Sequence, residues 1–400
     1  MKIAAVISEY NPFHNGHLYH LNKTREQTNA DAVITIMSGN FVQRGLPASI
    51  DKWSRAKTAI DCGIDLVIEL PALYSLSSAE IFAYGAVSLL NSLNVIDYLS
   101  FGSESGNIED LKKIANIIAF ESDDYKRILK LNLKTGLPFH KARFEAIKYC
   151  TNNSDITNLV KTSNNILALE YIKHLIKLES SITPVTIKRL GGDYNSQGLN
   201  SSYSSATAIR KHLNNSTEYE HIMKHVPEKS FEIIENLYKE GSEFSYEDKM
   251  VDYLKYKMFS SKDININLPE ASEGIENKIF NALKTATTFD DLVSNIKTKR
   301  YTYTRISRIL CQYFIGFDEY NIETLRKETC PYARILGANS KGREVLKLIK
   351  KSSDIKLISN IHRGESLVSD LENQSSYAYS LLNNKIDYDY EYKKKPYIII

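Results

Sequence analysis

The N-terminal half of the chain alternates short apolar runs with helical segments, and this alternation constrains the fold more than any other feature. Runs rich in β-branched residues predict strands at Lys2–Ser8, Asp31–Met37, Asp65–Leu70 and Ile96–Gly102. Start and stop signals between these runs predict helices at Gly16–Gln27, Asp51–Gly63 and Ser77–Leu93. Strands that are apolar almost throughout and are separated by helices are typical of a parallel sheet covered on both faces. The sequence therefore predicts an α/β fold.

Two of these helices have specific start signals. Asp51 stands where an N-cap residue is expected, and Gly63 follows the last turn of that helix. The third helix has a Ser at its start and Glu80 in its first turn, which is the arrangement of a capping box. The rest of this region is predicted to hold a helix, a strand, a polar loop and a helix, at Ser163–Leu178, Ile182–Gly192, Gly191–Ser205 and Ser205–Asn215. We place the end of the first domain, 1–215, at this point.

The remainder of the chain has a different pattern. Residues Glu218–Phe317 are predicted to be mostly helical, and Tyr332–Ser359 to form a strand, a helix and a strand. We therefore expect a mainly helical region at 216–330 and a small C-terminal α/β piece at 331–400. The tail Lys393–Ile400 is interpreted either as a basic arm or as an apolar end that docks as an edge strand.

Composition excludes few functions. A net charge of +3 neither demands nor excludes a nucleic-acid partner, so the local charge pattern must decide. The four cysteines, Cys62, Cys150, Cys311 and Cys330, have no metal-ligand spacing and are expected to be reduced thiols of a cytosolic protein. The N-terminal apolar run is short and is interrupted by Glu9, which indicates a strand rather than a signal peptide. No apolar run is long enough to predict a membrane span.

The quartet His14-Asn15-Gly16-His17 follows the first strand and stands where the next helix begins. Backbone N–H groups at a helix N-terminus are unpaired and favour negative charge, and Gly16 lets a bound group approach the backbone. His14 and His17 are three positions apart, so both reach the same side of the first turn. Their imidazoles could donate hydrogen bonds to phosphate oxygens and support phosphoryl or nucleotidyl transfer.

Two alternatives for the quartet are open. His14, His17 and His20 are spaced three apart and could ligate zinc, although Asn15 and Gly16 are typical of a phosphate-binding turn and no cysteine lies nearby. The other alternative is a set of ordinary surface histidines on a turn. The position directly after a first strand favours the phosphate-binding interpretation over both.

A second candidate phosphate-binding element is the segment "SSATAIRKHL". Ser204, Ser205 and Thr207 stand at a helix start and could hydrogen-bond phosphate oxygens, and Arg210 could neutralise their charge. Alone, the pattern also fits a plain Ser-capped helix. Its pairing with the histidine quartet in the same domain favours a nucleotide site.

These motifs together resemble a known family. The segment "NPFHNGHLYH" is similar to the HxGH signature of the nucleotidyltransferase superfamily, whose members have a Rossmann-like core, and "SSATAIRKHL" fits a second superfamily element. "MSGNFVQRGLPA", "DLVIELP", "FGSESG", "NNILALEYI", "IKRLGGDY" and "KTKRYTYTRISRIL" extend the likeness to the bacterial tRNA(Met) cytidine acetate ligases over nearly the whole chain. The resemblance implies a Rossmann-like nucleotidyltransferase core with a parallel sheet, followed by the helical region and the C-terminal piece.

The resemblance also implies a reaction. Acetate attacks the α-phosphate of ATP and gives acetyl-adenylate and pyrophosphate. The acetyl group then passes to the wobble cytidine of elongator tRNA(Met), which becomes N4-acetylcytidine, and no coenzyme A is needed. Mg²⁺ on the ATP phosphates is expected chemically, although the sequence shows no dedicated ligand for it.

By the same resemblance, His14 and His17 are the expected catalytic residues, which stabilise the transition state. The other expected ATP-binding residues are Ile7, Ser8, Glu9, Tyr10, Asn11, Pro12, Phe13, Asn15, Gly16, Leu18, Tyr19, His20, Gly102, Asn165, Arg189, Ser205 and Arg210. Two neighbours compete for these roles, Asn164 with Asn165 and Lys188 with Arg189. The loop Ser38–Gly45 is a further candidate for the acetate or cytidine pocket, through Ser38, Asn40, Gln43 and Arg44.

The segment Lys297–Arg308 is the expected tRNA-binding element. It contains no acid, and its cations could contact phosphates while its tyrosines stack on unpaired bases. The residues predicted to bind tRNA are Lys297, Lys299, Arg300, Tyr301, Arg305 and Arg308, and a weaker basic patch lies at Lys341–Lys351. The alternative is a solvated helix face.

Two competing functions share the nucleotide motifs. One is a nucleotidyltransferase that acts on a small phosphorylated metabolite, which the long helical region with its basic segment disfavours. The other is a non-catalytic RNA-binding protein with a nucleotide fold, which the intact His14, His17 and Arg210 disfavour.

Overall fold

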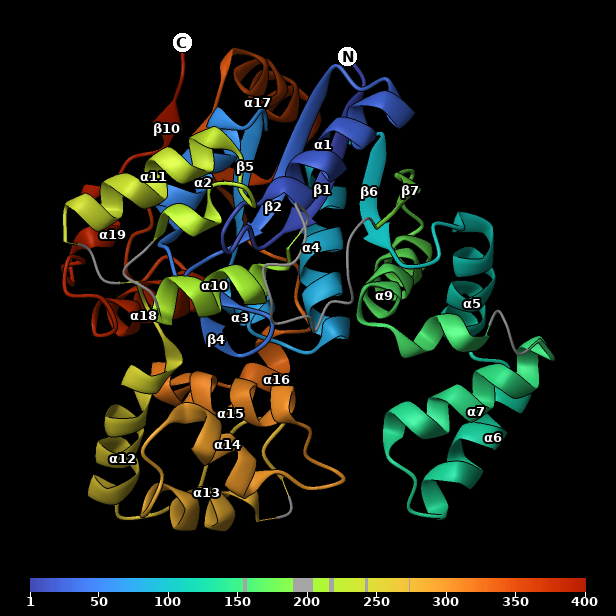
Figure 1. Ribbon diagram of the computed structural model, residues 1–400. Helices are drawn as coiled ribbons and strands as arrows, with labels where there is room; N and C mark the ends of the chain where they lie inside the picture. The colour runs from blue at the N-terminus through green and yellow to red at the C-terminus, as the bar shows by residue number, and fades with distance from the viewer. Residues whose placement is uncertain (154–156, 190–203, 216–218, 242–243, 273) are drawn as a thin grey trace.

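The computed structural model describes residues 1–153, 157–189, 204–215, 219–241, 244–272 and 274–400, so the predicted polar loop lies outside the described residues up to position 203. Five strands at its centre are mutually parallel, as predicted (Figure 1). In spatial order they are β5 (Leu66–Leu70), β2 (Ala32–Ser38), β1 (Ile3–Ser8), β6 (Tyr98–Ser103) and β7 (Thr183–Lys188). The Rossmann-like expectation is confirmed, because all five carboxyl ends meet at one edge of the sheet.

The C-terminal part of the chain extends this same sheet. The strand–helix–strand predicted at Tyr332–Ser359 is present as β8 (Tyr332–Ala338), α17 (Ser340–Ser352) and β9 (Lys356–Ile358). Strand β8 pairs antiparallel with β5, while β9 and the short β10 (Tyr397–Ile398) pair parallel with β8. The tail is therefore an edge strand rather than a basic arm. The boundaries at residues 215 and 330 stay predictions, although β8 belongs to the N-terminal sheet.

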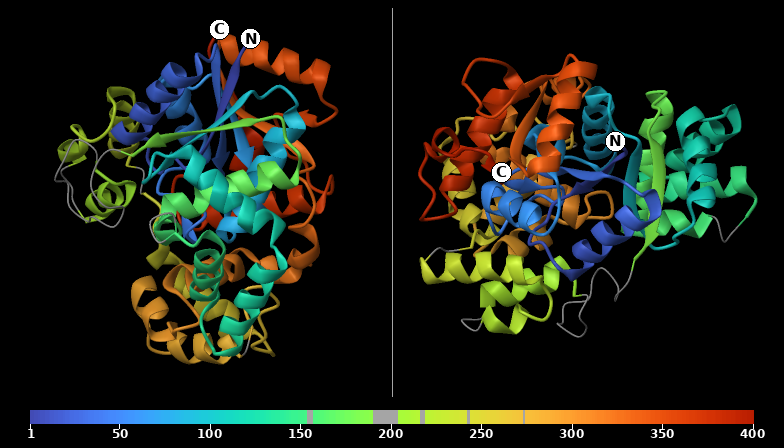
Figure 2. Two further views of the ribbon diagram at one scale, coloured as in Figure 1. Left: turned by 90° about the vertical axis from the view of Figure 1, so that its right-hand side faces the viewer. Right: turned by 90° about the horizontal axis from the view of Figure 1, so that it is seen from above.

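Helices cover both faces of the sheet, as the apolar strands require. Alternate residues of β1 point to opposite faces: Ala4 and Val6 pack with α1 (Asn15–Thr28) and α2 (Lys52–Asp61). Ile3 and Ala5 face the larger core under α4 (Ala79–Leu93), α9 (Ser163–Lys177) and α17. The right view of Figure 2 shows these helices on the two sides of the strands. This layering leaves only the ends of the strands open to a ligand.

The start signals of two helices have different outcomes. Asp51 is the N-cap of α2 and accepts hydrogen bonds from the backbone N–H groups of Trp53 and Ser54, as predicted. The capping box predicted at Ser77 is wrong, because Ser77 donates to the carbonyl of Leu73 in an unpredicted short helix, α3 (Ala72–Ser75). Glu80 of α4 instead pairs with Lys173 of α9.

Two helical projections extend beyond the carboxyl edge, at the end opposite the chain termini (Figures 1 and 2). On the β7 side, α5 (Ile108–Phe120) leads into a hairpin of α6 (Asp123–Lys134) and α7 (Phe139–Thr151), followed by η1 (Leu159–Lys161). The other projection holds η3 (Glu247–Lys249), α12 (Met250–Ser260), α13 (Ile275–Leu283), α14 (Phe289–Ile296), α15 (Tyr303–Ile315), η4 (Phe317–Glu319) and α16 (Ile322–Leu325). The region predicted to be mostly helical is therefore helical.

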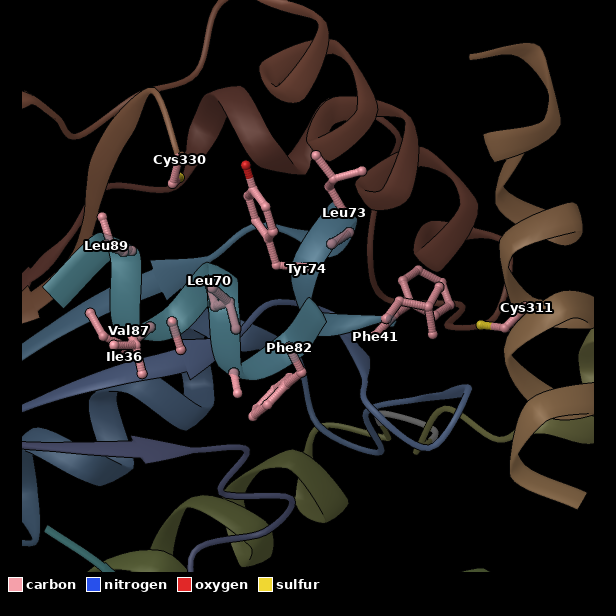
Figure 3. Close-up of a cluster of buried hydrophobic side chains, with 14 of the residues drawn as sticks. Ile36, Phe41, Leu70, Leu73, Tyr74, Phe82, Val87, Leu89, Cys311 and Cys330 are labelled. Carbon is pink, nitrogen blue, oxygen red and sulfur yellow. The ribbon is translucent and has the colours of Figure 1, made fainter. Parts of the chain in front are cut away.

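The remaining elements are helices outside the sheet and one short hairpin. They are α10 (Ala206–Asn215), η2 (Tyr219–Ile222), α11 (Glu228–Lys239), α18 (Leu367–Ser380), α19 (Tyr390–Lys393) and the hairpin of β3 (Phe41–Val42) and β4 (Leu46–Pro47). Figure 3 shows Phe41 within a cluster of buried hydrophobic side chains, between α3 and the helix that carries Cys311. The ring of Phe41 contacts those of Phe314 in α15 and Tyr379 in α18. The hairpin is thus fixed by packing against the C-terminal helices.

The four cysteines are free thiols, as predicted; Cys311 and Cys330 are buried and Cys62 and Cys150 are half-buried. Across the described ranges, no helix is both long and apolar enough to cross a membrane.

Candidate active site

A cavity of about 460 Å³ opens at the carboxyl edge of the sheet. Its walls come from the end of β1 and the start of α1, the β3–β4 hairpin, the end of β6, the start of α9, the end of β7 and the start of α10. Crevices at the carboxyl ends of parallel strands are the usual ligand sites of such sheets. The elements predicted to bind a nucleotide therefore meet at one place.

His14 and His17 cap the first turn of α1 with their own imidazoles. Nδ1 of His14 accepts from the backbone N–H of Gly16 at 3.1 Å. Nδ1 of His17 accepts from the backbone N–H of His14 at 3.2 Å, and the two rings stack with centroids 3.6 Å apart. Because both Nδ1 atoms are acceptors, the ring hydrogen of each neutral imidazole is on Nε2. The cap thus fixes the rings of two residues that line the cavity, each with its N–H donor on Nε2.

These histidines are neutral at physiological pH. Burial, with the nearby charges of Arg189 and Arg210, lowers the pKa of His14 to about 3. Burial and the neighbouring His14 hold the pKa of His17 well below its usual value. Burial and Arg189 lower the pKa of His20 to about 4. The cavity is therefore an anion site in which arginines carry the charge and the imidazoles act as neutral donors.

Buried polar atoms near the histidines fit an anionic ligand. Arg210 donates from Nη1 to the carbonyl of Asn11 at 2.8 Å and from Nη2 to the hydroxyl of Thr207 at 3.2 Å. Asn11 accepts from Ser49 through Oδ1, but its buried Nδ2 has no hydrogen-bond partner among the described residues. An unpaired buried donor costs about 1–3 kcal/mol, so a ligand oxygen that accepted from it would be favoured.

The two asparagines at the start of α9 have different roles. Asn165 is buried and caps the turn after β6, because its Oδ1 accepts from the backbone N–H groups of Glu104 and Ser105. Asn164 lines the cavity and accepts from Nη1 of Arg189 at 3.2 Å. Asn164 rather than Asn165 therefore faces the cavity, and the contact of either residue with a nucleotide stays a prediction. Adjacent helical residues point about 100° apart, so only one of the two can face the ligand.

Glu104 and Arg55 organise the site and were not predicted. Glu104 accepts from the N–H groups of Asn164 and Asn165 at the start of α9. Burial would raise the pKa of the Glu104 carboxyl, but hydrogen bonds from Asn164 and Thr162 outweigh it and lower this pKa. Arg55 is buried and donates to the carbonyls of Glu9 and Ser38, which fixes the turns after β1 and β2. An acid after a strand end is the only sequence signal for Glu104.

The cavity collects most of the predicted nucleotide residues. Those that line it are Ile7, Ser8, Glu9, Tyr10, Asn11, His14, Gly16, His17, Tyr19, His20, Gly102, Arg189, Ser205 and Arg210, while Pro12, Phe13, Asn15, Leu18 and Asn165 do not. A Cβ on Gly102 would lie 3.3 Å from Cγ of Arg189, so a side chain there would push that arginine. Lys188 lines the cavity as well, and so both alternatives at this position reach it. From the Ser38–Gly45 loop, Gln43 and Arg44 line the cavity, whereas Ser38 and Asn40 are buried elsewhere.

The basic segment Lys297–Arg308 is only partly available to RNA. The ring of Tyr301 is buried and its hydroxyl donates to the carbonyl of Ser272, so it cannot stack on a base as predicted. Arg308 is buried in an ion pair with Glu270, and Arg305 donates to the carbonyl of the same Glu270. Only Lys297, Lys299 and Arg300 of the six predicted residues are exposed.

The zinc interpretation of the histidines is not supported by the geometry. Within the described ranges, the one group of ligand atoms that converges within 4.8 Å is Glu80, Glu170 and His174, and the HNGH histidines form no such group. Lys173 lies between the two carboxylates of that group, 2.5 Å from Glu80 and 3.0 Å from Glu170. Its ammonium already supplies the cation that these acids require.

Known proteins resemble this chain along its whole length. A profile of the family described as HIGH Nucleotidyl Transferase matches residues 1–394. A tRNA(Met) cytidine acetate ligase of Clostridium novyi (strain NT) is 48% identical over 397 residues, and one of Clostridium tetani (strain Massachusetts / E88) is 49% identical over 400. Each comparison covers 99% of this chain and 99% of the relative.

Solved structures agree with the sequence relatives. The crystal structure of Thermotoga maritima TmcAL (apo, form I) superposes with a TM-score of 0.91, and that of the same protein bound with alpha-thio ATP (form II) with 0.88. Both are 32% identical to this chain and cover 100% of both chains.

Proposed function

The chain belongs to the HIGH nucleotidyl transferases and, within them, to the tRNA(Met) cytidine acetate ligases, and on that premise we propose that it activates acetate with ATP and acetylates the wobble cytidine of elongator tRNA(Met). The observation that carries this proposal is the pair of Nε2–H donors of His14 and His17 beside Arg189 and Arg210 in one cavity. This set of neutral donors and cations suits a transferring phosphoryl group.

In the first step, a carboxylate oxygen of acetate attacks the α-phosphorus of ATP. A new P–O bond forms, the bond to the β-phosphate breaks, and pyrophosphate leaves with the electron pair. No general base is required, since acetate is already ionised near neutral pH. His14 and His17 donate to oxygens on which charge builds, and Arg189 and Arg210 neutralise the phosphates.

In the second step, the exocyclic amine of the cytidine attacks the carbonyl carbon of acetyl-adenylate. The C–N bond forms, the bond between the acetyl carbon and the phosphate oxygen breaks, and AMP leaves. The amine must lose a proton, which a group near the acceptor has to take.

The nucleotide is expected to bring Mg²⁺ on its phosphates, where the ion would neutralise charge. Glu9 is the one carboxylate among the described residues that line the cavity, so the protein offers little else to hold the ion. We place the reaction in the cytoplasm, where elongator tRNA is found. The exposed Lys297, Lys299 and Arg300 are proposed to contribute tRNA contacts.

Acetate-dependent exchange of labelled pyrophosphate into ATP tests the first step. The wild-type protein, with unmodified tRNA(Met) present, is expected to exchange label only when acetate is added. Exchange that occurs equally without acetate would contradict the proposal and favour a nucleotidyltransferase that acts on a phosphorylated metabolite.

A further inference from the structure

The α6–α7 hairpin is a basic projection to which the reaction has so far assigned no role. It extends beyond the carboxyl edge of the sheet on the α9 side (Figure 1). Within α6 only Tyr125 is buried, so nearly the whole surface of that helix faces solvent. Arg143 of α7 pairs with Glu170 of α9 at 2.7 Å. The hairpin is therefore fixed to the helix whose first turn lines the cavity.

The hairpin carries more net positive charge than the whole chain. From the start of α6 to the end of α7, residues 123–151 contain five lysines and two arginines against three acids, Asp123, Asp124 and Glu145, which gives a formal charge of +4. The whole chain has a charge of +3, so the other residues together are net negative. An isolated basic segment in such a chain marks a surface for a polyanion.

Most of these cations have no acidic partner. Lys126, Lys130 and Lys134 are exposed and recur every four residues, so they form one stripe along α6. In the described part of the chain, neither their ammonium groups nor those of Lys141 and Lys148 make an ion pair or a hydrogen bond. The neighbouring α5 differs, because its Lys112 and Lys113 pair with acids one turn away.

Aromatic side chains accompany the cations. Phe139, at the start of α7, is 59% exposed, and Tyr149 near its end is 52% exposed. Exposed aromatic rings among lysines are typical of surfaces that bind unpaired RNA, where bases stack on rings and cations contact phosphates. Binding to an acidic membrane surface would need only the lysines, and it would not explain the exposed rings.

We propose that the α6–α7 hairpin is an RNA-binding arm that holds the phosphate backbone of the substrate tRNA beside the cavity. This proposal rests on the proposed function. It assigns to exposed residues of the arm the tRNA contacts that were predicted for the buried Tyr301 and Arg308. Contacts to three lysines of one stripe would release counterions from the RNA and make binding depend on salt.

The test compares two charge-matched triple variants. In the arm variant, Lys126, Lys130 and Lys134 become Gln; in the control, the exposed and ion-paired Lys229, Lys239 and Lys393 become Gln. The arm variant is expected to bind unmodified tRNA(Met) at least 10-fold more weakly. The slope of its log binding constant against log salt concentration is expected to correspond to about two fewer phosphate contacts. Acetate-dependent pyrophosphate exchange is expected to be kept.

Equal tRNA affinity of the two variants would overturn the arm. The proposal would also be overturned if the arm variant bound tRNA normally but lost the binding to phosphatidylserine vesicles that the control variant keeps. That result would identify a membrane-binding surface instead. If the arm variant loses tRNA affinity but the wild type shows no acetate-dependent exchange, the RNA-binding role of the arm is supported and the proposed activity is contradicted.

A different observation concerns the proton of the second step. Among the described residues that line the cavity, Glu9 is the single carboxylate, while five cationic side chains line it: Arg44, Lys188, Arg189, Arg210 and Arg308. The β3–β4 hairpin holds the side chain of Glu9 through the backbone of Gln43, whereas His14 and His17 stand at the first turn of α1.

The position of Glu9 is well fixed. Its carbonyl accepts from buried Arg55 at 2.6 Å, and its Oε1 accepts from the backbone N–H of Gln43 at 3.1 Å. Glu9 lines the cavity, and among the described residues no hydrogen bond reaches its Oε2, so this oxygen can accept from a ligand. Carboxylates recognise the exocyclic amine of cytosine as hydrogen-bond acceptors. They also take protons in general base catalysis.

We infer that Glu9 is the catalytic residue that accepts the cytidine amine and removes its proton as the acetyl C–N bond forms. This rests on the proposed function. The proton moves from the amine nitrogen to Oε2 while AMP leaves with the electron pair of the broken bond. Glu9→Gln keeps an oxygen acceptor for Gln43 but loses the basicity.

Glu9→Gln is expected to lower acetyl transfer to tRNA by at least 100-fold, as loss of a general base does, and to lower acetate-dependent pyrophosphate exchange by a much smaller factor. Glu9→Asp, which keeps a base, is expected to recover part of the transfer. Equal loss of exchange and transfer would place Glu9 in the first step and overturn the inference, as would undiminished transfer. A wild type without transfer would instead contradict the proposed function.

Discussion

Replacing His17 by Ala is expected to slow acetate-dependent pyrophosphate exchange by about 10²–10³-fold, the usual effect of removing one preorganised donor to a developing charge. The imidazole of His17 accepts from the backbone N–H of His14 through Nδ1, so its ring hydrogen is on Nε2. Glutamine would keep an N–H donor in its side-chain amide, whereas alanine removes both the donor and the cap. The lost cap is expected to lower the free energy of unfolding by about 0.5–2 kcal/mol.

The control for this variant is His362→Ala, at an exposed position outside the cavity, which is expected to keep the wild-type rate. The urea midpoint of His17→Ala should fall by no more than the loss of one helix cap, which excludes unfolding as the cause. An exchange rate within threefold of the wild type would contradict the assignment of His17 to the chemistry.

The second large effect is expected in stability, at a buried cluster of five charged side chains. Nζ of Lys52 lies 2.6 Å from Glu69, 2.9 Å from Glu372 and 2.9 Å from Glu391. Arg334 pairs with Glu69 at 3.0 Å and also with Glu391. Burial and the neighbouring Glu372 raise the pKa of Glu69 to about 8, which favours its protonated form and reduces the excess of three acids over two cations.

Lys52→Met is expected to lower the free energy of unfolding by about 3–5 kcal/mol, because it leaves a buried carboxylate without its counter-charge. Burial alone would lower the pKa of Lys52, but the three carboxylates outweigh it and raise this pKa, which shows how strongly the cluster holds the ammonium. The urea midpoint measures the loss. Lys57→Met is the matched control on the same helix, since Lys57 is only half-buried and its pair with Asp61 contributes less than about 1 kcal/mol.

A double variant separates charge imbalance from lost packing. Adding Glu372→Gln to Lys52→Met restores the net charge of the wild-type cluster, and it is expected to recover about 1–3 kcal/mol of the loss. If the double variant is less stable than Lys52→Met by the full effect of Glu372→Gln alone, the two residues do not interact and the account of the cluster is wrong.

Local patterns were sufficient to predict the centre of the fold. The apolar runs that became β1, β2, β5 and β6 are short and β-branched, and the helix caps lie within a few residues of the helices that they start. The HNGH turn was recognisable because its function depends on the order of adjacent residues. Caps and motifs of this kind involve residues that are close together in the sequence, so a local pattern is enough to predict them.

The errors concern partners that are distant in the sequence. Tyr301 and Arg308 looked available for RNA because no acid lies beside them, yet Ser272 and Glu270 on another segment occupy both. Asn164 and Asn165 are indistinguishable until Glu104 fixes the rotation of α9. The α/β end piece could not be assigned to the main sheet from its own pattern, since the pairing of β8 with β5 spans most of the chain.

Transfer of label from [14C]acetate to unmodified elongator tRNA(Met), with ATP and without coenzyme A, tests the central claim most directly. The account predicts about one labelled N4-acetylcytidine per tRNA after nuclease digestion, and none on a transcript whose wobble cytidine is replaced by uridine. Absence of label on tRNA with a free wobble cytidine would contradict it.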